Sequence, residues 1–180
     1  MKLLRRNIRW RKRKARPSQI EIATDATLET GATGGTAITV GETTETANYG
    51  AFQIPEVLFS EAVRPPYAAG TFTFYEMKEP GCIYGHVALQ FENKTEAPIL
   101  AEDIAAVQLI YDDAYIYTGF SMIEEPGGKN FAYTDLTEVK SGETGNLHYL
   151  FTVPLEVAES NKPLSVSLKI NGTTYILKVR

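Results

Sequence analysis

The residues best suited to chemistry in this sequence are two histidines, His86 and His148, and a single cysteine, Cys82. A cysteine nucleophile needs an adjacent base to be active at neutral pH. Cys82 and His86 are separated on a predicted strand by about 13 Å of rise, which is too far for direct contact. We therefore interpret Cys82 as an inert thiol. Both histidines alternate with apolar neighbours along predicted strands, so we expect them to face solvent.

Three pairs of neighbouring acids could supply oxygen ligands to a hard cation such as Ca²⁺, namely Glu102-Asp103, Asp112-Asp113 and Glu124-Glu125. None of these pairs has the D-x-D-x-D-G spacing of a dedicated calcium loop. No feature of the sequence sets two carboxylates at the separation that a glycosidase needs. We interpret the pairs as solvated turns, and we expect no catalytic residue, no metal site and no cofactor.

Tyrosines are frequent, with 10 in the chain, and Tyr115 and Tyr117 share one face of a predicted strand. Tyrosine offers a large contact area at a low cost in side-chain entropy, so this pair is our candidate for a ligand face. Ordinary strand composition explains the same residues, because tyrosine is common in β-sheets. The sequence leaves both interpretations open.

Charge divides the chain into two unequal parts. Residues 2–16 carry nine basic side chains and no acid, whereas residues 17–180 carry nine basic side chains against 22 acids. The acidic part does not offer the basic face that phosphate contacts require. Polyanion binding is therefore expected from the head of the chain, through Arg5, Arg6, Arg9, Arg11, Lys12, Arg13 and Lys14.

On a helical wheel, the apolar residues of this head, among them Leu4, Ile8 and Trp10, fall opposite most of the basic ones. Such a basic amphipathic pattern is typical of segments that lie on an anionic membrane or bind another polyanion. Short isolated helices are marginal in water, so a solvated, disordered arm is an alternative. Of the two binding interpretations, we favour membrane contact through residues 1–16 over nucleic-acid binding.

Composition predicts three consecutive regions. Residues 1–17 form a basic arm, residues 18–45 a linker, and residues 46–180 a folded domain. The linker has a Thr at every third position from Thr24 to Thr39, and it contains too little apolar area to offset the entropy of ordering its chain. The domain boundary is therefore expected near residue 45.

The folded region alternates between apolar and polar residues with the period of two that predicts β-strands. The clearest run alternates from Leu164 to Ile170, turns at Asn171-Gly172 and alternates again to Val179. Asn-Gly between such runs is a strong hairpin signal, because both residues tolerate positive φ. Seven or more short strands without a long helix predict an all-β fold, an antiparallel β-sandwich.

Four short motifs follow one another along this region, Tyr75-Glu76, Phe91-Glu92-Asn93-Lys94, Gly142-Glu143-Thr144 and Val153-Pro154. Their order over residues 49–180 resembles a large uncharacterised family of immunoglobulin-like domains from secreted proteins and lipoproteins of Gram-positive bacteria. That family is distantly similar to the mycobacterial immunoprotective extracellular protein. The motifs are turns and strand ends, so the resemblance implies a fold and says little of chemistry. It also implies a signal peptide, an anchor cysteine and a tether, of which the sequence shows the tether-like segment.

These observations predict a non-enzymatic binding or structural module that presents an immunoglobulin-like domain at a bacterial surface, with a protein or glycan as its partner. The alternative is an intracellular or phage-related protein that binds nucleic acid through the basic arm and assembles through the β-domain. The basic head continues into polar sequence rather than an apolar signal stretch. We expect an extracellular or cell-surface location if translation starts upstream of Met1, and a cytoplasmic one if Met1 is the start.

Overall fold

The computed structural model describes residues 34–180, so the basic arm and residues 18–33 of the predicted linker lie outside the described residues. The described part holds fifteen strands and two short helices, in the order β1 (Thr36–Ile38), β2 (Thr44–Thr46), β3 (Gly50–Ser60), β4 (Ala62–Val63), β5 (Tyr75–Glu76), β6 (Cys82–Asn93), β7 (Ile99–Leu100), α1 (Ala101–Ile104), β8 (Ala106–Tyr111), β9 (Tyr115–Tyr117), β10 (Phe120–Glu124), β11 (Phe131–Tyr133), β12 (Glu138–Val139), β13 (Thr144–Pro154), α2 (Leu155–Glu159), β14 (Leu164–Ile170) and β15 (Thr173–Lys178).

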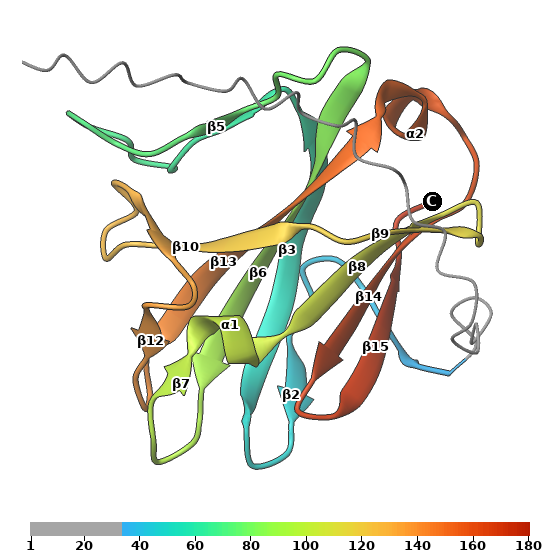
Figure 1. Cartoon of the computed structure of the whole chain (residues 1–180). Coiled ribbons are helices and arrows are strands. Elements are labelled where there is room, and N and C mark those ends of the chain that lie inside the picture. Colours follow the sequence, from blue (N-terminus) through green and yellow to red (C-terminus); the bar gives the residue numbers. More distant parts are fainter. Residues whose placement is uncertain (1–33) are drawn as a thin grey trace, which may run out of the picture.

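Most strands belong to two sheets that form a sandwich (Figure 1). One sheet has the strand order β1-β15-β14-β8-β9, and the other has the order β11-β10-β13-β6-β3-β2. Two short pairs, β4 with β5 and β7 with β12, lie outside these sheets. β1 and β15 run parallel, whereas the other described pairs run antiparallel. The prediction of an all-β antiparallel sandwich is confirmed, with one parallel pair at an edge.

The core lies between the two sheets and follows the alternation of the sequence. On β14, Leu164, Val166, Leu168 and Ile170 are each at most 1% exposed. They pack with inward-facing residues of the other sheet, including Val87, Leu89, Phe91, Leu147, Phe151 and Val153. Because successive strand residues point to opposite faces, the polar residues between them are directed away from this core.

Two hairpin turns depend on residues that accept positive φ. Asn171 and Gly172 have φ of 45° and 79°, and they join β14 to β15 with Ile170 opposite Thr173. Asp112 and Asp113 have φ of 54° and 52° in the turn between β8 and β9. Short polar side chains tolerate this left-handed region better than bulky ones do. Both turns were predicted at these positions and are confirmed.

The predicted boundary at residue 46 is wrong, because part of the expected linker joins the sandwich. β1 pairs with β15 from Thr36 to Ile38, and β2 pairs with β3 from Thr44. Ile38 packs against the core, which gives this edge an apolar contact. The Thr-rich composition suggested a tether, yet threonine is also favoured in strands. The folded domain therefore begins at least ten residues earlier than composition indicated.

The β6–β13 pair is buried on both faces. One face meets the β14 sheet. On the other face, Leu150 of β13 packs with Val63, Met122 and Phe131 in a smaller cluster, against which Tyr75 and Tyr84 pack. In Figure 1, β5 lies beside the β10 end of the sandwich, away from β14 and β15. We call β4, β5, β11 and the chain between β4 and β5 the outer cover. It places a second, smaller buried layer over polar residues of β6 and β13.

Candidate functional site

A chain of polar side chains crosses four strands on the covered face of the larger sheet. Gln53 on β3 donates through Nε2 to Gln90 Oε1 at 2.6 Å, and Gln90 Nε2 donates to Asn146 Oδ1 at 3.1 Å. Asn146 Nδ2 then donates to Glu124 Oε2 at 3.2 Å. Strand register causes this arrangement, because Gln53 pairs with Gln90 and Gln90 pairs with Asn146. Every amide in this chain is oriented toward the Glu124 carboxylate.

A second chain reaches the same carboxylate from two histidines. His148 Nε2 lies 2.8 Å from Glu124 Oε1, and His86 Nε2 lies 2.8 Å from His148 Nδ1. An ionised carboxylate can only accept, so His148 carries its proton on Nε2 when its ring is neutral. Its Nδ1 then accepts from His86 Nε2–H. The two chains therefore converge on Glu124, one at each oxygen.

The histidines lie in the small buried layer, which corrects the expectation that they face solvent. His86 is 6% exposed and His148 is 8% exposed. Their rings stack with centroids 5.0 Å apart, and Phe131 meets the His148 ring edge-on at 5.1 Å. Burial, together with the charge that His148 can carry, lowers the pKa of His86 from 6.5 to about 4. Alternation placed both rings opposite the main core correctly, but the outer cover fills that side.

Glu124 was expected in a solvated turn with Glu125, and this is also corrected. The Glu124 side chain is 13% exposed at the end of β10, whereas Glu125 is exposed at the start of the following turn. Asn130 Nδ2 donates to Glu125 Oε1 at 3.1 Å within that turn. The two neighbouring acids therefore have different environments, and only Glu124 joins the buried chain.

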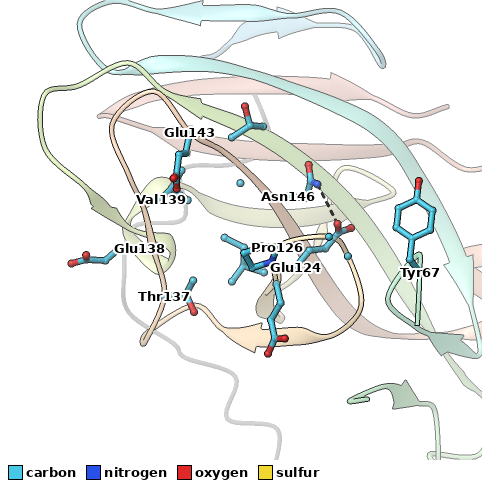
Figure 2. A pocket seen from close by; sticks show the side chains of 14 residues that line it. Tyr67, Glu124, Pro126, Thr137, Glu138, Val139, Glu143 and Asn146 are labelled. Carbon is cyan, nitrogen blue, oxygen red and sulfur yellow. Dashed lines mark hydrogen bonds between the residues drawn. The ribbon is translucent and has the colours of Figure 1, made fainter. Parts of the chain in front are cut away.

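A cleft of about 480 Å³ opens where the hydrogen-bonded chain ends, between the β10–β11 turn and the β12–β13 region. Figure 2 shows Glu138 and Glu143 on one side, Tyr67 on the other, and the bonded pair Glu124 and Asn146 between them. Four carboxylates, those of Glu124, Glu125, Glu138 and Glu143, line the cleft, and no Lys or Arg does. The cleft is thus acidic, with one carboxylate fixed from inside.

Short backbone contacts hold the walls of the cleft. A Cβ on Gly145 would lie 2.7 Å from Val139 Cγ2, so glycine is needed for β12 to approach β13 this closely. Tyr67 N donates to Gly128 O at 2.9 Å, and Thr73 N donates to Asn130 Oδ1 at 2.7 Å. These two bonds tie the chain between β4 and β5 to the β10–β11 turn. The outer cover and the cleft therefore share one wall.

The other residues singled out from the sequence do not join this site. Tyr115 is 57% exposed at the edge strand β9, but Tyr117 packs against the core, so only one of the two rings is free. Burial and, to a smaller extent, the negative charge of Glu79 raise the pKa of the Cys82 thiol, which disfavours its thiolate. The basic residues from Arg5 to Lys14 lie outside the described residues.

The remaining acidic pairs lie apart from the cleft lining, on other elements. Glu102 and Asp103 are exposed on α1, and Asp112 forms an ion pair of 2.8 Å with Lys162. Within residues 34–180, no group of three His, Cys, Asp or Glu side chains is arranged to hold a metal ion. No helix of the described part is long and apolar enough to cross a membrane.

Comparison with known proteins gives a fold and no activity. No family model matches the sequence, and no curated protein matches it. An uncharacterised β-sandwich protein from Clostridium difficile 630 aligns with a TM-score of 0.74 at 23% identity, over 81% of this chain and 95% of that one. A conserved hypothetical protein from Bacillus anthracis aligns with a TM-score of 0.54 at 13% identity, over 79% and 94%. At these identities the likeness shows the fold alone, a β-sandwich shared with uncharacterised proteins of Gram-positive bacteria.

Proposed function

We propose that this chain is a non-enzymatic, immunoglobulin-like binding module of a bacterial cell envelope, and that the cleft beside Glu124 holds its ligand. One observation carries the proposal: both Glu124 oxygens accept hydrogen bonds from inside the protein, while the residue still lines the cleft. Each carboxylate oxygen has a further lone pair to offer. A ligand would meet an acceptor that is already ordered, so little side-chain entropy would be lost on binding.

The lining of the cleft favours a ligand that donates hydrogen bonds or carries positive charge. Its four carboxylates accept but cannot donate when ionised, and the cleft has no basic residue to attract an anion. The ring of Tyr67, which is 72% exposed, adds a flat apolar surface at the rim. Amino sugars combine these features, because they present amines, hydroxyls and an apolar ring face. We therefore propose an amine-bearing glycan as the ligand class.

Strand order supports the immunoglobulin-like part of the proposal. The sheet order β3-β6-β13-β10 corresponds to strands A, B, E and D of an immunoglobulin sandwich, and β15-β14-β8 corresponds to G, F and C. β9 extends the second sheet where C′ lies in variable-type domains. Sandwiches of this kind present loops at both ends of the sheets, where binding residues commonly lie.

The condition of the histidines supports binding rather than catalysis. Both ring nitrogens of His148 are engaged, one by Glu124 and one by His86. His86, with its pKa near 4, is a poor proton acceptor at neutral pH, and neither ring lines the cleft. A general base must reach the proton it removes. In this arrangement the histidines orient Glu124.

The nucleic-acid alternative depends on the basic arm. The described residues carry nine basic side chains against 19 acids, and the strands of the larger sheet contain no Lys or Arg. Phosphate binding requires such cations. Any nucleic-acid function would therefore belong to residues 1–16, which the vesicle experiment in the Discussion separates from membrane contact.

A matched pair of probes tests the proposal. Full-length protein is titrated by calorimetry with a glucosamine tetrasaccharide and with its fully N-acetylated counterpart, which differ in their amines. We expect binding of the amine form, weakened at least tenfold by acetylation. Glu138→Gln with Glu143→Gln should weaken binding further, because each removes a wall carboxylate without changing side-chain size.

Asp113→Asn is the control for the double variant, since it neutralises an exposed acid in the β8–β9 turn, which does not line the cleft. It should leave the affinity unchanged. Equal affinity for the two sugars, or equal losses in the cleft and control variants, would show that the cleft is not the binding site.

A further inference from the structure

The hydrogen bond between His86 and His148 can form in two of the three protonation states of the pair. With both rings neutral, His86 Nε2–H donates to His148 Nδ1 across 2.8 Å. With one added proton the bond can reverse, so that His148 Nδ1–H donates to His86 Nε2. With two added protons both facing nitrogens carry hydrogen, and neither can accept. Two cationic rings would then meet at hydrogen-bond distance without a hydrogen bond.

The surroundings offer one contacting acid to balance these charges. Glu124 on β10 bonds His148 directly, and it can compensate the first proton. Glu56 on β3 is exposed and lies two residues before Leu58, the cross-strand neighbour of His86. Glu76 on β5 is exposed, and the phenols near this layer are Tyr84 on β6, Tyr75 on β5 and Tyr133 on β11.

The strands around the histidine pair carry no basic side chain. β3, β4, β5, β6, β10, β11 and β13 contain no Lys or Arg, and Arg64, just after β4, stacks on the Phe74 ring at 5.4 Å. Because Glu124 already balances the first proton, a second positive charge in the histidine pair has no contacting carboxylate of its own. In a buried site, an unpaired charge is relieved by exposure to water.

The outer cover is built from short strands. β4 and β5 have two residues each and β11 has three, whereas β6 has 12 and β13 has 11. The cover is fastened to the β10–β11 turn by the bonds from Tyr67 N and Thr73 N. Segments with few paired residues open at lower free energy than core strands.

We infer that the histidine pair is an acid-sensitive switch: uptake of a second proton separates the His86 and His148 rings and releases the outer cover from β6 and β13, while the sandwich core stays folded. This inference concerns the cover and does not depend on what the cleft binds.

The direction in which the pKa of His86 is shifted agrees with this switch. The closed state holds the His86 pKa at about 4, while an exposed ring would have its ordinary value of 6.5. The open state therefore binds protons more tightly, and its population rises as the pH falls from 6.5 toward 4. For this shift, the opening equilibrium should increase about 100-fold between pH 7 and pH 4.

Full-length protein with ¹⁵N-labelled histidine tests the switch, because the chain has two histidines and both belong to the pair. We expect the His86 ring to take up its proton near pH 4. Amide hydrogen exchange, corrected for intrinsic rates, should show protection in the strands of the outer cover, β4, β5 and β11, falling about 100-fold from pH 7 to pH 4. Protection in the β14–β15 hairpin, the internal control, should fall much less.

His86→Gln separates the pair from other acid effects. Glutamine can donate to His148 Nδ1 but cannot take up a proton, so protection in β4, β5 and β11 should fall only a few-fold over the same range. Asp112→Asn, which removes an ion pair at the β8–β9 turn, should behave like the natural sequence. If His86→Gln does not fold, the histidine titration and the hydrogen exchange of the natural protein test the switch without it.

Two results would overturn the inference. One is titration of the His86 ring near its ordinary pKa of 6.5 with unchanged protection in β4, β5 and β11. The other is an equal loss of protection in the outer cover and in β14–β15, since that would be global acid unfolding rather than release of the cover.

Discussion

Nε2 of His86 lies 2.8 Å from Nδ1 of His148, a residue 62 positions later in the chain. The two strands that carry these rings pair over eleven residues, and Leu150 rather than His148 stands directly opposite His86. The contact is therefore a diagonal one across the β6–β13 ladder, within reach of long side chains. It fixes the hydrogen positions of His148 and, through them, the orientation of the Glu124 carboxylate.

Loss of stability with acid is the first consequence that can be measured. Because the folded state lowers the His86 pKa from 6.5 to about 4, its stabilising contribution is complete above pH 6.5 and is lost as pH falls toward 4. The loss should amount to about 3 kcal/mol in the free energy of unfolding. Urea titrations at pH 7, 5.5 and 4 measure it. A pH dependence in His86→Gln as steep as in the natural protein would contradict this origin.

Truncating Leu168 tests the packing of the sandwich core. Leu168 is fully buried on β14, so Leu168→Ala should reduce the free energy of unfolding by about 2–5 kcal/mol. The neighbouring exposed residue gives the control, since Lys169→Ala should change stability by less than about 0.5 kcal/mol. Chemical denaturation of both variants measures the difference. A loss below about 1 kcal/mol for Leu168→Ala would place β14 outside the core.

Alternation made this part of the fold predictable. The run from Leu164 to Ile170 and the Asn171-Gly172 turn together specify a hairpin with one buried face, and the structure has that hairpin in that register. Local sequence was sufficient because turn residues and pattern agree there. The start of the domain was not predictable in the same way, since a three-residue strand such as β1 carries too few residues to show a period.

Alternation could assign the histidines to a face but could not reveal what covers it. The sequence around His148, Leu-His-Tyr-Leu-Phe, contains apolar residues at both odd and even positions, a pattern typical of a strand buried on both faces. That signal could have predicted a buried His148. Its contacts with His86 and Glu124 depend on strand register between distant segments, which one sequence does not specify.

Shortening the chain tests the corrected domain boundary. A chain that begins at Gly34 keeps β1 and β2, whereas one that begins at Thr46 loses β1 and most of β2, with Ile38 and its contact with the core. We expect the shorter chain to be less stable by about 1–3 kcal/mol, the value of burying one aliphatic side chain. Thermal and urea unfolding of the two chains measure this. Equal stability of the two chains would contradict the corrected boundary and favour a domain that begins at residue 46.

Vesicle binding tests the role proposed for the basic arm. Full-length protein should bind anionic vesicles through residues 1–16, and the affinity should fall steeply between low and physiological salt because exposed charges are screened within about 8–10 Å. Trp10 is the only tryptophan, so a blue shift of its fluorescence reports entry into the membrane interface. Trp10→Ser should lose the part of binding that survives moderate salt.

The nucleic-acid alternative predicts a different outcome of that experiment. Equal affinity for DNA and vesicles, with no shift of Trp10 fluorescence on vesicles, would leave a general polyanion-binding arm. It would also remove the support for a location at the membrane surface.

The tautomers of the two histidines at neutral pH test the central claim most directly, because the binding proposal requires Glu124 to be an ionised acceptor held by donors on both oxygens. Long-range ¹H–¹⁵N correlation spectra of the full-length protein identify the protonated nitrogen of each neutral ring. We predict Nε2–H for both His86 and His148 at pH 7. A neutral His148 ring protonated on Nδ1 would mean that its Nε2 accepts from Glu124, and this would contradict the account.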